Sequence, residues 1–488
     1  MKMQEKGLLL LGWLVFVLLL FIFQTATILI SEYKRPAKTI AWLSILFIFP
    51  IIGFFMYYFI AREYSRRKKV HSQGGARKEI QHQRPLQEVM AERQMNEESF
   101  LPDEPRLRDW LRHVPGAPIT MHNQVEVLTN AAVTYEAMLQ AIDKARSYIH
   151  FEFYTIRDDG IGIRFQEALI RKANAGVKIR VIYDGMGSHA LSKTYIGKLK
   201  QAGIGVEPFL KPLIAFFDKR LNYRNHRKIV VVDGVVGFVG GINIGDEYLG
   251  EDPKLGFWRD THLMLHGDAV HDLQCTFVND WFFVSGEKLA EHDLSPLHME
   301  TKTEILTSPV QIISSGPDAR WDAIQEMYFA GLIAAKERIW MTTPYFIPDP
   351  SIVMALKSAA ISGVDVRIIL PFKADSRIVQ YASLSYLQEL LQAGVRFFLY
   401  QKGFVHAKII IVDGIMATVG TANVDMRSFF SNFELNAVMF DSKVIERLES
   451  DFQMDLQECM EVKMPEFERR PRSEKRKEAI ARLLSPLF

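Results

Sequence analysis

The sequence has little cysteine and almost no net charge, and each shortage excludes a class of protein. Only Cys275 and Cys459 occur among 488 residues, and the formal net charge is +2. The two cysteines stand far apart without neighbours at metal-ligand spacing, which fits a reducing compartment and excludes a disulfide framework. The small net charge argues against a protein that binds nucleic acid over its whole surface.

The usual patterns of a metal site are also missing. The sequence has no cysteine cluster, and no dense group of carboxylates flanks the motifs that carry the candidate chemistry. We therefore expect no metal ion and no other cofactor. A track of interleaved aromatic and basic residues is absent as well, so we expect no nucleic-acid partner.

Two long apolar stretches near the N-terminus indicate a membrane anchor over residues 1–61. Residues of about 7–30 and 39–60 are each long enough to cross a bilayer, and no small-x-small cleavage site marks the first as a removed signal peptide. The strongest basic cluster, at 62–69, follows the second stretch. This asymmetry predicts a multi-pass cell-membrane protein, anchored by a helical hairpin, with the remaining chain on the cytoplasmic side.

The chain beyond the anchor predicts an α/β fold that occurs twice. Residues 62–117 are polar and charged, which is typical of a juxtamembrane linker. Helical and strand-like segments then alternate, and the segment order of 118–300 returns in 301–488, where ERIWMTTPYF echoes SYIHFEFY. We expect two α/β sandwich halves related by pseudo-twofold symmetry, followed by a basic amphipathic tail. Two interpretations of that tail are equally favoured: a helix that contacts lipid, and a segment that docks on the body.

One motif recurs at the same place in each half. Residues 225–243 read NHRKIVVVDGVVGFVGGIN, and residues 405–423 read VHAKIIIVDGIMATVGTAN. Each copy combines a histidine, a lysine two positions later, an apolar strand and an Asp-Gly turn. The candidate catalytic residues are therefore His226, Lys228, Asp233, His406, Lys408 and Asp413. For both aspartates, simple turn chemistry is the alternative interpretation.

A two-residue turn would fix the pairing of the two strands in each copy. It would place Lys228 opposite Val239 and His226 opposite Gly241, and, in the second copy, Lys408 opposite Val419 and His406 opposite Thr421. An asparagine would follow two residues after each residue that faces a histidine, on the same face of the strand. The candidate phosphate-binding residues are thus Asn243, Asn423, Gly241 and Thr421.

Two histidines, two lysines and two asparagines suit the chemistry of a phosphodiester. Ammonium and amide groups hold its oxygens, while one imidazole attacks phosphorus and the other protonates the leaving alkoxide. Each imidazole needs a partner that orients it. Asp260 in the first half and Glu434 in the second are the candidates, and surface carboxylates on a neighbouring strand are the alternative.

The paired HxKxxxxD motifs resemble those of the phospholipase D superfamily. The stretches GFVGGINIGDEYLG, WRDTHL and GTANVDMRSFFSNFELNA, behind two apolar spans, further resemble the bacterial cardiolipin synthase family. This resemblance implies two phospholipase D-like halves that transfer a phosphatidyl group from one phosphatidylglycerol to another through a phosphohistidine. It also implies anionic membrane lipid as the surrounding partner. Gly241 departs from the superfamily pattern, in which serine is common.

The sequence leaves four points open: the order of the two histidines, the acceptor, the role of one apolar stretch and the oligomeric state. By analogy with the superfamily, His226 is the expected nucleophile and His406 the general acid and later base. A hydrolytic phospholipase D, or a transferase with another alcohol acceptor, would use identical residues. The apolar stretch 212–217 before the first motif is either a lip for acyl chains or a core strand, and the oligomeric state is left open.

Overall fold

Two β-sheets lie face to face in the body of the molecule, and each comes from one of the repeated parts of the sequence. The computed structural model describes residues 2–31, 36–57, 104–210, 223–289, 308–319 and 321–485. The first sheet has the strand order β2 (Asn123–Thr129), β10 (Thr261–Gly267), β8 (Val236–Gly240), β7 (Ile229–Val232), β3 (Tyr148–Phe153), β4 (Lys178–Asp184) and β5 (Gly205–Phe209).

The second sheet repeats this order strand for strand. Its inner strands run β11 (Val310–Ser315), β20 (Asn432–Met439), β18 (Met416–Gly420), β17 (Ile409–Val412), β12 (Arg338–Thr342), β14 (Asp365–Pro371) and β15 (Arg396–Tyr400), and β1 (Ile119–Thr120) and β21 (Cys459–Glu461) extend the sheet at its two ends. In both sheets the three strands at the β3 and β12 end are parallel, and the others pair antiparallel. The predicted duplication of an α/β fold is therefore confirmed.

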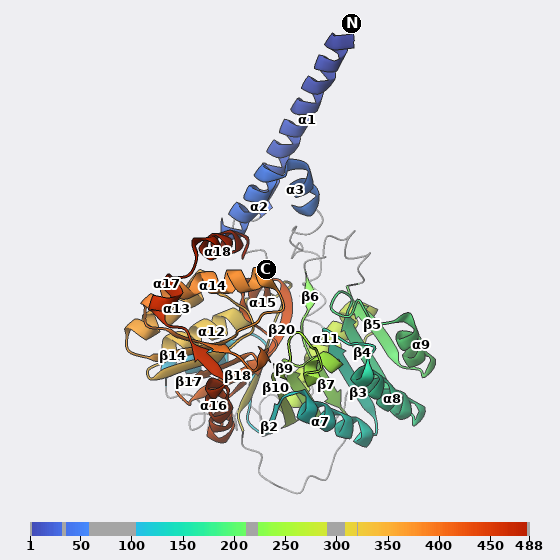
Figure 1. Cartoon of the computed structure of the whole chain (residues 1–488). Helices are drawn as coiled ribbons and strands as arrows, with labels where there is room; N and C mark the ends of the chain where they lie inside the picture. The colour runs from blue at the N-terminus through green and yellow to red at the C-terminus, as the bar shows by residue number, and fades with distance from the viewer. Residues whose placement is uncertain are drawn as a thin grey trace.

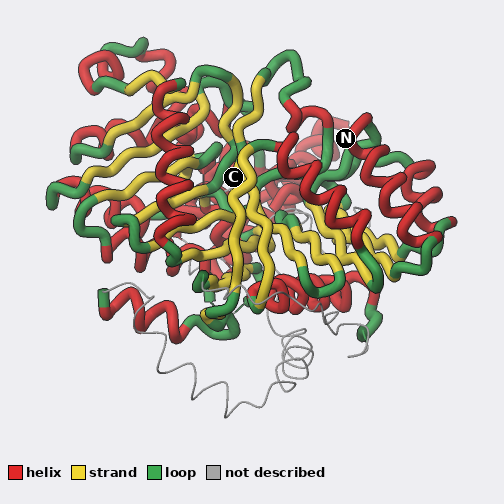
Figure 2. The backbone as a smooth tube through the Cα atoms, turned by 90° about the horizontal axis from the view of Figure 1, so that it is seen from below, coloured by secondary structure: helices red, strands yellow, loops and turns green. Residues whose placement is uncertain are grey.

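Helices cover the outer face of each sheet (Figure 2). Apolar side chains from both sheets fill the space between them. The outer helices of the first sheet are α7 (Ala131–Lys144), α8 (Gly160–Asn174) and α9 (Lys193–Gln201); those of the second are α12 (Ala323–Ala334), α13 (Pro350–Ile361) and α14 (Arg377–Gln392). Two further helices, α11 (Ala269–Ser285) and α16 (Ser442–Gln457), contribute side chains to the layer between the sheets.

Strand periodicity explains how β7 and β17 are buried on both faces. In the first sheet, Val230 and Val232 pack toward the outer helices, whereas Ile229 and Val231 face the second sheet. In an extended strand alternate side chains point to opposite faces, so a run of β-branched residues suits a strand that is covered on both sides. The motif strands β7 and β17 therefore lie in the centre of the molecule, and each has one face packed against the opposite sheet.

The register of the motif hairpins differs by one residue from the predicted one. Val239 pairs with Ile229, not with Lys228, because Val232 pairs with Val236 across a turn of three residues. The same shift places Val419 opposite Ile409. Asp233 and Gly234 both have positive φ, as expected for an Asp-Gly turn, but the extra turn residue moves the partner strand along.

Short strands are exchanged between the halves. The segment before the first histidine, β6 (Arg224–Asn225), pairs with the start of β20 in the second half. Reciprocally, β16 (Gly403–Val405), before the second histidine, pairs with β9 (Phe257–Arg259) in the first half. The two exchanges are what pseudo-twofold symmetry requires. A further pair, β13 (Phe346–Ile347) with β19 (Val424–Asp425), lies within the second half.

The N-terminal part of the body packs on the second half. Helix α6 (Pro105–His113) inserts Leu107 and Leu111 into the core of that half, and β1 (Ile119–Thr120) pairs with β11. The sequence had placed residues up to 117 in a linker and those from 118 in the first half. The structure attaches this segment to the second sheet instead, because its apolar residues are buried there.

One apolar helix projects from the body (Figure 1). Helix α1 (Lys2–Ser31) contains a span, Lys6–Ile30, that is long and apolar enough to cross a membrane. In place of one helix over 39–60, the structure has α2 (Pro36–Ile48) and α3 (Pro50–Met56). The chain folds back between them, so that Gly53 lies against the backbone of Leu46.

The break between α2 and α3 has a local cause. Pro50 has no backbone N–H and begins a new helix, a position at which proline is well tolerated. A helix of 13 residues, the length of α2, spans about 20 Å at 1.5 Å per residue, which is less than the apolar core of a bilayer. The expectation of one continuous second helix is therefore wrong, and residues 58–60 lie outside the described residues.

The C-terminal helices pack on the body between α14 and the base of α1 (Figure 1). Helix α18 (Arg472–Leu484) follows α17 (Met464–Glu468) and lies along α14, where Arg482 binds the Glu389 carboxylate at 2.6 Å. Its side chains Ile480 and Leu483 stay exposed. The tail thus docks on the body and keeps two apolar side chains exposed.

Candidate active site

The two motif histidines line one cavity between the halves. The cavity has a volume of about 550 Å³, and His226 and His406 both belong to its wall together with Asn243 and Asn423. Each imidazole rests against an aromatic ring: His226 lies 5.0 Å from the ring of Tyr154, measured between centroids, and His406 lies 5.1 Å from that of Trp258. The exchanged strands β6 and β16 bring the histidines to this place from opposite halves.

Each imidazole is held by a carboxylate from the other half. Glu434 accepts a hydrogen bond from Nδ1 of His226 at 2.9 Å, and Asp260 accepts one from Nδ1 of His406 at 2.7 Å. Both carboxylates are fully buried. Because Nδ1 is occupied in each ring, Nε2 is the nitrogen left for chemistry.

The exchanged strands explain why the carboxylates cross. The backbone N–H of His226 donates to the carbonyl of Phe433 at 2.9 Å, directly before Glu434. In the same way, the N–H of His406 donates to the carbonyl of Arg259 at 2.7 Å, directly before Asp260. Sequence spacing identified both carboxylates but placed each with the histidine of its own half. In the structure, neither histidine is oriented without the partner half.

Burial keeps both imidazoles neutral. It lowers the pKa of His226 to about 4, although the neighbouring Glu434 raises that pKa. Burial and the nearby Lys408 lower the pKa of His406 to about 3. The carboxylates stay ionised: burial raises the pKa of Asp260, but His406 and Lys408 outweigh it and bring the value to about 2. A neutral imidazole oriented by a carboxylate is a competent nucleophile.

Both motif lysines lie behind the histidines in the protein interior. Nζ of Lys228 donates to the backbone carbonyl of His226 at 2.7 Å, and Lys408 makes the same bond to the carbonyl of His406. Burial lowers the pKa of Lys228 to about 7 and that of Lys408 to about 8. Among the described residues that line the cavity there are both histidines but neither lysine. The ammonium groups therefore act on the cavity mainly through their charge.

These lysine pKa values predict how the binding of an anion depends on pH. An anion in the cavity favours the charged lysines, so the complex holds more protons than the free protein above pH 7. Linkage then requires the affinity to fall as pH rises from 7 to 9, by up to tenfold per pH unit for each proton taken up. Titration calorimetry with dimethyl phosphate, which stays anionic throughout, measures this slope. An affinity independent of pH over that range would contradict the values.

The motif aspartates lie in the hairpin turns and bind backbone there. Asp233 accepts hydrogen bonds from the N–H groups of Arg146, Ser147 and Tyr148 at 2.8–2.9 Å, at the start of β3. Asp413 binds the equivalent three N–H groups at the start of β12. Neither belongs to the described wall of the cavity. A catalytic role for these two residues is therefore not supported, and turn chemistry, the alternative, accounts for them.

Gly241 and Thr421 support the carboxylates and do not reach the cavity wall. The hydroxyl of Thr421 donates to Glu434 at 2.5 Å. At Gly241 a Cβ atom would lie only 2.1 Å from Oδ1 of Asp260, so the carboxylate fills the place of a side chain. Neither position is among the described residues that line the cavity, although phosphate contacts were predicted at both. Glycine stands where a serine is common because Asp260 needs the space.

The two asparagines differ in what their amides bind. Asn243 is held on both sides, since its oxygen accepts from the N–H of Thr155 at 3.1 Å and its NH₂ donates to Tyr248 at 3.1 Å. Within the described part of the chain, the buried side-chain oxygen of Asn423 has no hydrogen-bond partner. Both line the cavity. Asn423 is thus the amide that is available to a ligand.

Sequence reasoning missed two arginines and a tyrosine in the wall of the cavity. Arg224 lies in β6, Arg427 lies in α15 (Met426–Phe430), and Tyr154 follows β3. The signal was present, because Arg224 stands two residues before His226 and Arg427 belongs to the MRSFF segment after the second motif. Within the described residues, no group of three or more potential metal ligands occurs.

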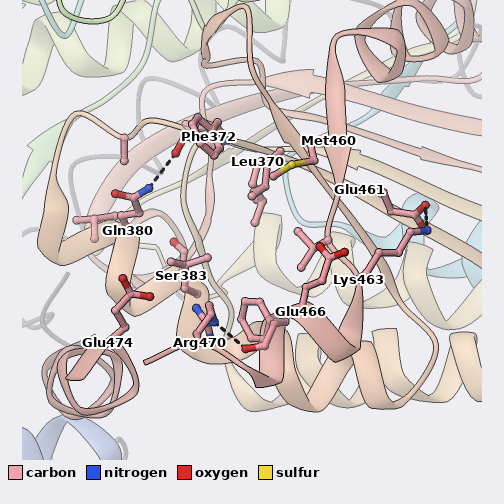
Figure 3. A pocket seen from close by; sticks show the side chains of 18 residues that line it. Leu370, Phe372, Gln380, Ser383, Met460, Glu461, Lys463, Glu466, Arg470 and Glu474 are labelled. Carbon is pink, nitrogen blue, oxygen red and sulfur yellow. Dashed lines mark hydrogen bonds and ion pairs between the residues drawn. The ribbon is translucent and has the colours of Figure 1, made fainter. Parts of the chain in front are cut away.

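A second cavity adjoins the first on the side of the anchor helix. It measures about 410 Å³, and Val379 of α14 lines both cavities. Its walls are mainly apolar, with Leu370, Phe372 and Met460 among them (Figure 3). Charged side chains surround this apolar wall, namely Glu461, Lys463, Glu466, Arg470 and Glu474 (Figure 3). Such a combination suits an amphiphilic ligand.

Comparison with known proteins identifies the family. The family described as "Cardiolipin synthase, PLD-like domain" matches residues 138–281 and 329–456. A cardiolipin synthase of Alkalihalophilus pseudofirmus is 43% identical over 98% of this chain and 94% of that protein. The chain belongs to the cardiolipin synthase family. A cardiolipin synthase of Halalkalibacterium halodurans, also 43% identical, matches 98% of this chain and 95% of its own length.

Cardiolipin synthases share their fold with a solved relative. The crystal structure of a phosphatidylserine synthase from Haemophilus influenzae superposes with a TM-score of 0.61 and 13% identity, covering 78% of this chain and all of that one. At this identity the likeness concerns the fold alone. The family predicted from the paired motifs is confirmed. In this chain, its two motif histidines are each held by a carboxylate from the opposite half.

Proposed function

We propose that this chain is a cardiolipin synthase, which transfers a phosphatidyl group from one phosphatidylglycerol to another and releases glycerol. The observation that carries the proposal is the cavity with two imidazoles from different halves, each held at Nδ1 by a buried carboxylate. Two groups on either side of one phosphorus can divide attack and proton transfer between them. Family membership supports the choice of lipid.

The proposed first step begins with the anionic phosphodiester bound between the imidazoles. Nε2 of His226 attacks phosphorus, the bond from phosphorus to the glycerol oxygen breaks, and His406 gives its proton to that oxygen. Burial lowers the pKa of His406 to about 3, so the charge of the bound phosphate must raise this pKa for the ring to carry the proton. Lys228 and Lys408 stabilise the charge that develops on the phosphoryl oxygens.

The second step regenerates the histidine. Neutral His406 takes the proton from a hydroxyl group of a second phosphatidylglycerol, whose oxygen attacks phosphorus while the bond to His226 breaks. The products of the two steps are glycerol and cardiolipin. Asp260 and Glu434 hold the rings, the side-chain NH₂ group of Asn423 is proposed to donate to a phosphoryl oxygen, and Asn243 positions the wall of the cavity.

Membrane lipid is the proposed substrate class for two structural reasons. The apolar second cavity shares the wall residue Val379 with the catalytic one. Helices α17 and α18, which contribute to its wall, lie on the side of the body from which α1 projects (Figure 1). We propose that α1 crosses the bilayer and keeps both cavities at its surface. A second crossing and a cytoplasmic catalytic side remain predictions from the sequence, which labelling of introduced cysteines from either side of the membrane would decide.

Product analysis tests the proposed function. Purified protein in detergent, given labelled phosphatidylglycerol as its only lipid, is expected to form cardiolipin and glycerol in equal amounts. Phosphatidate as the main product would instead identify a hydrolytic phospholipase D, the rival that uses the same residues. The variant carrying both His226→Ala and His406→Ala serves as the control for lipid carried through purification.

A further inference from the structure

Two arginines place positive charge on one side of the catalytic cavity. Arg224 in β6 pairs in register with Asn432 of β20, and Nε of Arg427 donates to Oδ1 of Asn432 at 3.3 Å. All three residues line the cavity, as does Tyr154, whose ring contacts His226. Both arginines act electrostatically on Tyr154. The two guanidinium groups therefore lie together next to the proposed nucleophile.

Two guanidinium groups lie close together there, and the carboxylates of Asp425 and Asp184 offset part of their charge. Burial and the neighbouring Arg224 both lower the pKa of Arg427, which is the effect of one cation on another. Guanidinium groups match phosphate oxygens in geometry and can bind them through paired hydrogen bonds. The arrangement around Asn432 is thus suited to a phosphate group.

The pseudo-twofold symmetry of the site is broken at these two positions. Arg224 precedes His226 by two residues, whereas Phe404 precedes His406 by two. Arg427 follows Asn423 by four residues, whereas Glu247 follows Asn243 by four. On that opposite side Glu247 binds Arg157 at 3.1 Å. The catalytic residues are duplicated, but the arginine pair is not.

Synthesis of cardiolipin needs an anion site that hydrolysis does not need. The donor phosphate lies between the imidazoles, while the acceptor phosphatidylglycerol brings a phosphodiester of its own into the same cavity. We infer that Arg224 and Arg427 bind the phosphodiester of the acceptor lipid and so present its hydroxyl group to the phosphohistidine. This inference rests on the proposed function and assigns the two substrates to different parts of the cavity.

The test compares two acceptors with the same donor. Cardiolipin formation uses an acceptor with a phosphate, whereas incorporation of labelled glycerol into phosphatidylglycerol uses one without. Arg224→Gln and Arg427→Gln are each expected to lower kcat/KM for the phosphatidylglycerol acceptor by roughly tenfold or more, which is the effect of losing one charge-assisted hydrogen bond. Glycerol incorporation should fall several-fold less, so the ratio of the two rates changes.

Two matched variants complete the design. Arg157→Gln removes a guanidinium from the opposite wall of the same cavity and is expected to leave the ratio of the two rates unchanged. Arg427→Lys, which keeps the charge, should recover part of the loss. Equal losses with both acceptors would overturn the inference, because the arginines would then serve the donor or the fold. A wild-type protein that forms only phosphatidate would instead refute the proposed function itself.

Discussion

The His226→Ala variant is expected to lose cardiolipin synthesis by a factor of about 10⁴ or more, since removal of a nucleophile leaves only binding and charge stabilisation. His226 meets the physical requirements of a nucleophile: its pKa is lowered to about 4, its Nδ1 is fixed by Glu434, and it lines the cavity. Initial rates of glycerol release measure the loss. The exposed histidine His122, which binds Asp268 at the surface, provides the His122→Ala control that should keep full activity.

Trapping the covalent intermediate separates the two histidines. Rapid quenching with phosphatidylglycerol labelled in its acyl chain should leave label on the peptide that contains His226. His406→Ala is expected to slow formation of this intermediate by about 10²- to 10⁴-fold, the usual contribution of a general acid. Label found on His406 and never on His226 would reverse the two roles. A variant of either histidine with undiminished turnover would contradict the shared cavity altogether.

The sequence identified the reacting groups but not how they are combined. The HxK pattern predicted His226 and His406, because a motif of this length rarely recurs by chance in two equivalent strands. Sequence spacing could not predict that Glu434 holds His226, since that contact depends on the exchange of strands between halves. The pairing of distant strands is set by packing across the whole molecule, which local patterns do not contain.

Other differences have local causes that the sequence contained only in part. The Asp-Gly turn at Asp233 was predicted, but its third residue, which shifts the register, was not. One membrane-spanning helix was expected over 39–60, whereas the structure shows two helices folded on each other at Pro50. Arg224 and Arg427 stand far apart in the chain and meet only because β6 pairs with β20. The stretch 212–217 lies outside the described residues, so its role as a lip stays a prediction.

The crossed carboxylates give the second large effect. Glu434→Gln is expected to lower kcat by about 10²- to 10⁴-fold, by analogy with the loss of an orienting carboxylate in a catalytic triad. Glu434 is fully buried and its pKa stays below the ordinary value, because His226 and Lys228 outweigh the opposing effect of burial. The amide of glutamine carries no charge and can turn its NH₂ group toward Nδ1, which would favour the wrong tautomer of His226.

The two carboxylates should also fail at different steps. Because Glu434 orients the nucleophile from the opposite half, Glu434→Gln should impair the attack on phosphorus, whatever the leaving group. Asp260→Asn should impair proton transfer by His406, so its defect should shrink with a phosphodiester whose leaving group, such as nitrophenolate, needs no proton. Pairing within each half would give the opposite result, with the nitrophenyl substrate rescuing Glu434→Gln and not Asp260→Asn. The Thr421→Val variant, which removes the hydroxyl bound to Glu434, should show a weaker form of the defect seen in Glu434→Gln. Thr421→Ser should restore the rate, because that defect arises from the hydrogen bond and not from packing.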